Sequence, residues 1–390
     1  MPGIELPGAS QHSGALVQDR AHLRMNQHLS VFPKRLYALD ALRGIAALAV
    51  VFWHWQHFFF QGALPGPLQT EEQPFFSMFA LFYRHGGDAV ALFFSLSGFI
   101  FFWLFGHAVA RGDLTARQFF VERFSRIYPL HLATFAAVAL LQMAYTRYTG
   151  NAFVYPFNDL YHGVLNVFLA PAWGLEQGWS FNAPAWSISV EVLLYVAFFL
   201  LWRYSPLPML TSLFLIAVAA YVFPAQYKIS LGVFSFFCGG VGYVWVAWLL
   251  QRMPPRWVGT GLTIGCVAGW WLFGVDQPLI KFALLFPLTI MAIAACHQVL
   301  EPVARRLAWL GDISYAAYLL HFPLQITAAL LADKFFAGRS VFYQPWTLLL
   351  FFAVLIGASL ICHRWFERPM QQWLRQFGRE RLASGVIARQ

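Results

Sequence analysis

The chain has 390 residues, of which 59% are hydrophobic and 11% are charged. Soluble domains usually carry about 25% charged residues, so this composition excludes a soluble globular protein. The net charge of +9 does not predict a nucleic-acid partner, because the basic residues stand in short segments between apolar runs, where topology signals lie. About 20 apolar residues cross a bilayer core as a helix, which satisfies its own backbone polar groups. Runs such as 39–60 and 187–202 therefore predict an all-α integral membrane protein whose partner is the lipid bilayer.

The apolar runs predict about ten transmembrane helices within one membrane domain, residues 36–368. The expected spans are 37–60, 88–110, 127–147, 185–203, 207–223, 229–250, 257–275, 279–300, 311–332 and 345–366. The segment 160–173 is apolar but short, so we expect an interfacial or re-entrant helix there. We expect residues 1–35 to form a mobile cytoplasmic tail without a cleavable signal peptide, and residues 369–390 to form a basic cytoplasmic tail.

The distribution of basic residues predicts the orientation. With the N-terminus in the cytoplasm, only six of the 26 lysines and arginines fall on the outer side, which leaves 20 on the inner side. The outer six are Arg84, Arg147, Lys228, Lys281, Lys334 and Arg339. This bias indicates an N-in, C-in protein, in agreement with an even number of spans.

The first span carries two ionisable residues on one face. Arg43 and His54 are eleven residues apart, so on a helix they point the same way, about 16 Å apart along the axis. An ionisable side chain deep in a bilayer is usually functional. A donor with anionic phosphates and a long thin arm fits this spacing, with its phosphates at Arg43 and its reactive end at His54. The alternative is a topology-setting arginine and a packing histidine.

Two further segments offer charged candidates. The loop 111–126 is rich in arginine, and Arg123 and Arg126 would share a helix face on which guanidinium groups can bind phosphate. The alternative is a basic loop that contacts anionic lipid. Glu191 lies inside the fourth span at a depth similar to that of His54, so it can orient the imidazole, hold a hydroxyl or form a structural interhelix bond.

Smaller polar residues and cysteines inside the spans point mainly to packing. We expect His321 to tie helices together, with substrate contact as the alternative. Ser95, Ser97 and Gly98 are expected to allow close helix packing, with a role in lining a donor tunnel as the alternative. The four cysteines lie within or beside apolar runs, which predicts neither a disulfide framework nor a metal site.

Five stretches together resemble the acyltransferase-3 family of bacterial membrane O-acyltransferases. They are LDALRGIAALAVVFWH (39–54), FFSLSGFIFF (93–102), ERFSRIYPLH (122–131), NAPAWSISVEVLLY (182–195) and LGDISYAAYLLHFPL (310–324). In order, they run from the first span to the ninth. The chain departs from the family in having Glu122 where an arginine often precedes Arg123, and Val192 where a second glutamate often follows Glu191.

The resemblance implies a multi-pass protein of the bacterial inner membrane that moves an acyl group, acetyl above all, from acyl-CoA to a carbohydrate hydroxyl. It implies His54 as the catalytic residue and Arg43, Arg123 and Arg126 as functional arginines that would hold acetyl-CoA. We add Glu191 as a second catalytic candidate. The acceptor would be a surface glycan or lipid-linked sugar, with polysaccharide-synthesis machinery as a possible partner. A glycan transporter or flippase, and a non-catalytic scaffold of such machinery, are the alternatives.

The charge bias makes the orientation testable. Reporter fusions at residue 116 and at the C-terminus should both read cytoplasmic, and a fusion near residue 155 should read external. An external C-terminus would contradict an even number of spans.

Overall fold

The computed structural model describes residues 31–223, 226–336 and 338–387, and the described chain is almost entirely helical. The α-helices are α2 Tyr37–His54, α3 Phe76–His85, α4 Ala89–Leu104, α5 Gly106–Arg111, α6 Ala116–Thr149, α7 Leu160–Val167, α8 Trp186–Tyr204, α9 Pro208–Val222, α10 Tyr227–Arg252, α11 Pro255–Phe273, α12 Pro278–Ile280, α13 Phe286–Ala295, α14 His297–Phe335, α15 Pro345–Cys362 and α16 Arg368–Ile387. Short 3₁₀ or π turns are η1 Trp55–Phe59, η2 Thr70–Glu72, η3 Gly86–Asp88, η4 Ala183–Ala185, η5 Lys281–Leu285, η6 Arg339–Tyr343 and η7 His363–Glu367. Strands β1 Phe60–Gln61 and β2 Leu64–Pro65 pair antiparallel. The all-α prediction is confirmed.

Eight helical segments in the described chain are long and apolar enough to cross a membrane. They are Tyr37–Phe59, Phe76–Leu104, Ala116–Thr149, Ala183–Tyr204, Tyr227–Arg252, Pro278–Ala295, His297–Phe335 and Pro345–Phe377. The two remaining expected spans are also helices, α9 and α11, but neither is among these eight. The 15 residues of α9 rise about 22 Å, which is less than a bilayer core of about 30 Å.

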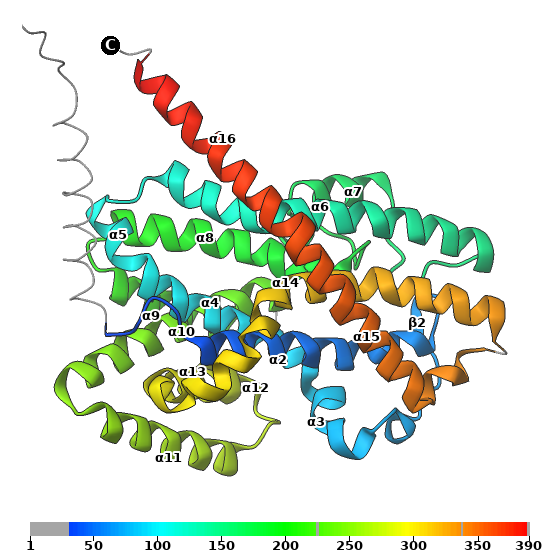
Figure 1. Ribbon diagram of the computed structural model, residues 1–390, viewed down its shortest axis with the longest axis horizontal. Helices are drawn as coiled ribbons and strands as arrows, with labels where there is room; N and C mark the ends of the chain where they lie inside the picture. Colours follow the sequence, from blue (N-terminus) through cyan, green and yellow to red (C-terminus); the bar gives the residue numbers. More distant parts are fainter. Residues whose placement is uncertain (1–30, 224–225, 337, 388–390) are drawn as a thin grey trace, which may run out of the picture.

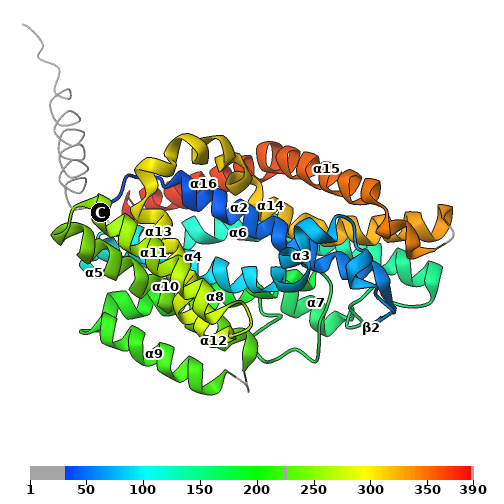
Figure 2. The same cartoon turned by 90° about the horizontal axis from the view of Figure 1, so that it is seen from below.

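The helices form an elongated bundle in which most of them follow the long axis (Figure 1). We call the end where α5 lies and α6 begins the arginine end, and the end that carries β1 and β2 the hairpin end. Helix α11 lies at the edge of the bundle in Figure 1, and α9 lies at its edge in Figure 2. Helix α16 runs obliquely across the bundle towards the arginine end, and its C-terminal part extends above the other helices in Figure 1.

Glycines allow the two main helix pairs to approach closely. Helix α2 packs along α14, and a methyl group on Gly44 or Gly311 would overlap the backbone of the opposite helix. Helices α4 and α10 meet in the same way, because a Cβ on Gly98 would run into the Phe236 carbonyl and one on Gly239 into the Ser95 carbonyl. Small residues at such crossings are typical of helix packing in lipid, which confirms the packing role expected for Gly98.

Three expectations about the flanking segments change. The basic segment 111–126 is mostly helix rather than loop, because Thr115 and Gln118 form a capping box that starts α6 at Ala116. Residues 1–30 of the expected N-terminal tail lie outside the described residues, whereas Phe32 is buried against Phe99 and its neighbours. Residues 369–387 of the expected C-terminal tail belong to helix α16, which packs against α6, and residues 388–390 lie outside the described residues. The short helix α7 agrees with the expected non-spanning segment.

The α4–α10 crossing predicts a strong effect of added volume. Gly98→Val should destabilise the protein by about 1–3 kcal/mol or more, because its side chain must displace the α10 backbone. Gly261→Val is the matched control, since a Cβ at Gly261 meets nothing within 4 Å. Melting temperatures and monodispersity of the two purified variants in detergent test this. Equal melting temperatures would show that the crossing tolerates a side chain.

Candidate functional site

His54 is the last residue of α2 and lies where the helix tightens into the 3₁₀ turn η1. The final carbonyls of a helix have no partner within it, and here the side chain of Gln325 on α14 donates from Nε2 to the His54 carbonyl at 2.8 Å. The side-chain oxygen of Gln325 accepts from Nδ1 of His57 at 3.1 Å. One amide therefore fixes the end of α2 and places both histidines. Both are nearly buried, with 7% and 4% of their surface exposed.

The imidazoles of His54 and His321 are in direct contact. His54 Nδ1 lies 3.1 Å from His321 Nε2, and the rings stack with centroids 4.9 Å apart. The other nitrogen of His321, Nδ1, lies 2.6 Å from the Tyr318 carbonyl. This confirms the expected tie, because His321 links α14 to α2.

The hydrogen bonds fix the tautomers when both rings are neutral. The Tyr318 carbonyl can only accept, so His321 must carry its proton on Nδ1 and present Nε2 as an acceptor. His54 then donates from Nδ1 to His321, and its own Nε2 is left unprotonated. The His54 ring also interacts with the Val50 carbonyl, one turn earlier on α2. Among the described residues, no hydrogen bond is found to Nε2 itself, so this nitrogen is available to accept a proton from a group in the adjoining space.

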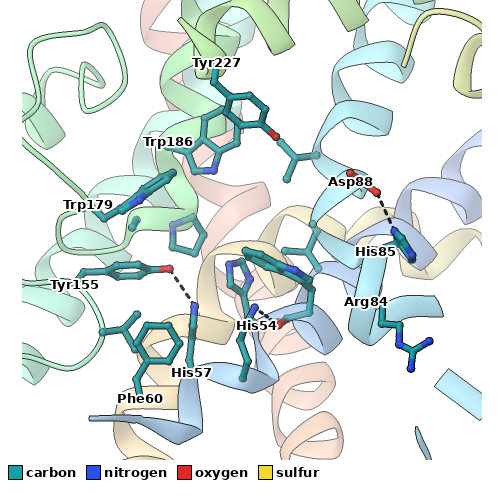
Figure 3. Close-up of a pocket in the computed structure, with 18 of the residues that line it drawn as sticks. His54, His57, Phe60, Arg84, His85, Asp88, Tyr155, Trp179, Trp186 and Tyr227 are labelled. Atoms are coloured by element: carbon teal, nitrogen blue, oxygen red, sulfur yellow. Dashed lines mark hydrogen bonds and ion pairs between the residues drawn. The ribbon is translucent and has the colours of Figure 1, made fainter. Parts of the chain in front are cut away.

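A cavity of about 820 Å³ adjoins His54 and His57 at the hairpin end, and we call it the histidine cavity. His54, His57, Tyr155, Trp179 and Trp186 all line it, and Figure 3 shows the two histidines beside Tyr155 and below the tryptophans. The Tyr155 hydroxyl donates to His57 Nε2 at 3.3 Å. The cavity reaches the surface, since Trp179 in its wall is 43% exposed.

Charged groups gather on the opposite wall of the histidine cavity. Lys281 of η5 is only 4% exposed and donates to Asp88 at 2.5 Å and to the Val275 carbonyl at 2.6 Å. His85 lies 3.6 Å from the same carboxylate, on the side where Figure 3 also places Arg84. The cavity thus combines aromatic surfaces with a few fixed polar groups, a combination typical of ligand-binding sites.

The predicted arginines meet at the other end of α2. Arg43 donates from Nη2 to the Gly311 carbonyl at 2.7 Å and from Nε to the Ser314 hydroxyl at 3.1 Å, both on α14. Arg123 of α6 lies over the ring of Phe105 at 4.6 Å, and its buried Nε has no hydrogen-bond partner in the part of the chain that the structure describes. Arg126 joins them, and within the described chain no carboxylate lies within ion-pairing distance of it.

Two neighbouring cavities with shared lining residues contain the arginines. The central cavity, of about 120 Å³, is lined by Arg43, Arg123, Arg126, Ser97, Glu191, Tyr318 and further polar and apolar side chains. The basic cavity, of about 330 Å³, lies at the arginine end and shares with it Arg43, Ile100, Arg123 and Arg126. The predicted clustering of the three arginines is therefore confirmed in space. Arg117, which precedes them on α6, lines neither cavity and is exposed.

Of the three roles considered for Glu191, the structure agrees with an interhelix hydrogen bond and not with contact to the His54 imidazole. Its carboxylate accepts from the Ser97 hydroxyl at 2.8 Å in the central cavity, and no hydrogen bond joins it to His54 among the described residues. The place beside His54 is taken by His321 instead. Ser97 lines this cavity, so the tunnel-lining alternative fits Ser97 better than pure packing.

Tyr318 forms the boundary between the central and histidine cavities. Its side chain lines both, and its hydroxyl donates to the Pro184 carbonyl at 2.7 Å and lies 2.9 Å from the Ser187 hydroxyl. Its backbone carbonyl holds His321. The two functional regions therefore meet at one tyrosine.

His57 and Gln325 were absent from the sequence-based site. His57 follows His54 by three residues and Gln325 follows His321 by four, so each would share a helix face with a residue already singled out. That spacing is the signal that could have found them.

Comparison with known proteins agrees with the motifs. The model of a family described as an acyltransferase domain matches residues 36–364. The acyltransferase MdmB of Streptomyces mycarofaciens is 32% identical over 174 residues, which cover 43% of this chain and 40% of MdmB. The exopolysaccharide production protein ExoZ of Rhizobium meliloti is 27% identical over 330 residues, 78% of this chain and 94% of ExoZ.

A third relative, protein 2 in the picA locus of Rhizobium radiobacter, is 28% identical over 175 residues, 39% of this chain and 81% of that protein. No solved structure matches the chain. The family match spans the helices that carry His54, His321 and the three arginines. The chain is thus a multi-pass helical membrane protein that belongs to the acyltransferase-3 family.

Proposed function

We propose that this protein transfers an acyl group, with acetyl the expected one, from acyl-CoA to a hydroxyl of a surface glycan or lipid-linked sugar. The observation that carries the proposal is the hydrogen-bonded chain from the Tyr318 carbonyl through His321 to His54, which leaves His54 Nε2 unprotonated beside a large cavity. A buried neutral imidazole with a fixed tautomer suits general-base catalysis.

The donor fits the arginine end of the α2–α14 pair, away from His54 and His321. The phosphates of acetyl-CoA would bind in the basic cavity near Arg43, Arg123 and Arg126, because the guanidinium fork matches phosphate geometry. The pantetheine arm would pass through the central cavity towards His54. The helical distance of about 16 Å between Arg43 and His54 is within reach of such an arm.

The acceptor fits the histidine cavity. Ring faces such as those of Trp179 and Trp186 carry partial negative charge and favour the C–H groups on a sugar face, while Asp88 and Lys281 offer hydrogen bonds to hydroxyls. The name of ExoZ, a relative aligned over most of its length, points to exopolysaccharide production, which supports a carbohydrate acceptor and polysaccharide-synthesis machinery as a partner. The orientation expected from the charge bias places this cavity at the outer face of a bacterial inner membrane.

In the proposed reaction, His54 Nε2 takes the proton of the sugar hydroxyl as its oxygen attacks the thioester carbonyl. The C–S bond then breaks, CoA leaves as the thiolate, and the proton held by His54 passes to it, so that an ester and free CoA remain. Transfer through an acyl-imidazole is the competing route.

His54→Ala tests the proposal directly. General-base catalysis typically contributes 10²–10⁴-fold, so acyl transfer should fall by about that factor while CoA affinity is retained. His107→Ala is the matched control, since His107 is exposed on α5 and lines none of the three cavities. Ester-linked acyl groups on the surface glycans of a gene-deletion strain, complemented with each variant, provide the measurement. Near-normal acylation by a well-folded His54→Ala protein would remove His54 from catalysis.

His321 should act by positioning His54. His321→Ala removes the acceptor for His54 Nδ1, so kcat should fall roughly 10- to 100-fold, as for other groups that orient a reactive ligand, with little change in KM for acyl-CoA. His321→Gln keeps an acceptor oxygen and should retain more activity. Steady-state kinetics of both variants distinguish this role from a structural one. A loss of thermal stability with unchanged kcat would assign His321 to helix tying alone.

A further inference from the structure

The chain continues beyond the family match with a helix that reaches the basic cavity. The match ends at residue 364, and α16 begins at Arg368. Two of its side chains, Gln371 and Arg375, line the basic cavity together with the arginines of the matched domain. Helix α16 also packs against α6, the helix that carries Arg123 and Arg126. It is therefore part of the cavity wall.

Arg375 has hydrogen-bonding capacity that the protein does not use. Its Nε atom is buried, and within the described chain it has no hydrogen-bond partner. Arg35, which lines the same cavity, is by contrast paired with Asp40 at 2.5 Å and with Asp312 at 2.7 Å. A buried N–H group of a cation without a partner is costly, so it points to an anionic group that is bound there in use.

The cavity as a whole carries excess positive charge. Six basic side chains line it, against three carboxylates. The basic ones are Lys34, Arg35, Arg43, Arg123, Arg126 and Arg375, and the acidic ones are Asp40, Asp312 and Glu367. Glu367 is also engaged by His363 at 3.0 Å. The excess suits a ligand with several negative charges rather than a single carboxylate.

We propose that α16 completes the donor site, with Arg375 binding a phosphate of the nucleotide end of acyl-CoA and Gln371 adding a neutral hydrogen bond. This inference rests on the proposed function and extends it to a helix outside the family match. The shared ligand chemistry is a phosphate ester, which a phospholipid headgroup could also supply. The acyl-CoA source is favoured because the basic cavity joins the central cavity through Arg43, Arg123 and Arg126.

The test compares CoA binding to full-length protein in nanodiscs of uncharged lipid. Arg375→Gln should weaken CoA binding about tenfold or more, the range for loss of a charged hydrogen bond, and Arg375→Lys should restore part of it. Arg368→Ala is the matched control, because Arg368 is exposed on the same helix and does not line the cavity. Calorimetric titration gives the affinities, and melting temperatures show that each variant is folded.

The outcomes distinguish the assignment of acyl-CoA as the donor from the role of Arg375 in binding it. Absence of CoA binding by the wild-type protein would overturn the donor assignment itself. Wild-type binding that Arg375→Gln leaves unchanged, or that Arg368→Ala weakens equally, would overturn the role of Arg375 alone. A second titration in nanodiscs that contain anionic lipid distinguishes the phosphate sources. If Arg375→Gln changes lipid binding but not CoA binding, the site belongs to a headgroup.

Discussion

The close pairing of α2 with α14 is the constraint on which both functional regions depend. Gly44 and Gly311 let the two backbones approach, and Arg43 then reaches the Gly311 carbonyl on one side of this crossing. Further along the same pair, His54 meets His321. A shift of one helix against the other would change the arginine geometry and the histidine geometry together. This one helix contact therefore sets the distance and orientation of the arginine cluster relative to the two histidines.

Much of the architecture could be predicted because lipid leaves few choices. A long apolar run in a bilayer must be helical, so the eight long spans follow from hydropathy alone. The ends of helices depend on local chemistry that hydropathy does not register, and the capping box at Thr115 turned an expected loop into the start of α6. The burial of Phe32 cannot be predicted from the sequence, because a single aromatic residue in a polar stretch carries no periodic signal.

The candidate site was partly predictable for a related reason. Residues on one helix, such as Arg43 and His54, have a relation that helical geometry fixes, and so do Arg123 and Arg126. Contacts between residues on different helices depend on how each helix is rotated about its axis as well as on the depth of each residue in the membrane. Glu191 was matched to His54 by depth alone, and the structure turns it towards Ser97 instead. The positions of Tyr155 and Trp179 depend on the irregular segments before and after α7, whose path no period in the sequence describes.

The position of Tyr318 has a consequence for the membrane as an electrical barrier. If no side chain divided them, the basic, central and histidine cavities would form a polar route through the bundle. Each ion that crossed by this route would dissipate about 2.3 kcal/mol of the free energy stored in a membrane potential of 100 mV. The ring of Tyr318, bonded to the Pro184 carbonyl, stands at that junction. In the proposed reaction, a thioester arm that travels from the arginines to His54 would pass this ring and would itself fill the opening that it creates. An acyltransferase with this arrangement can pass an acyl group across the membrane without letting ions leak through it.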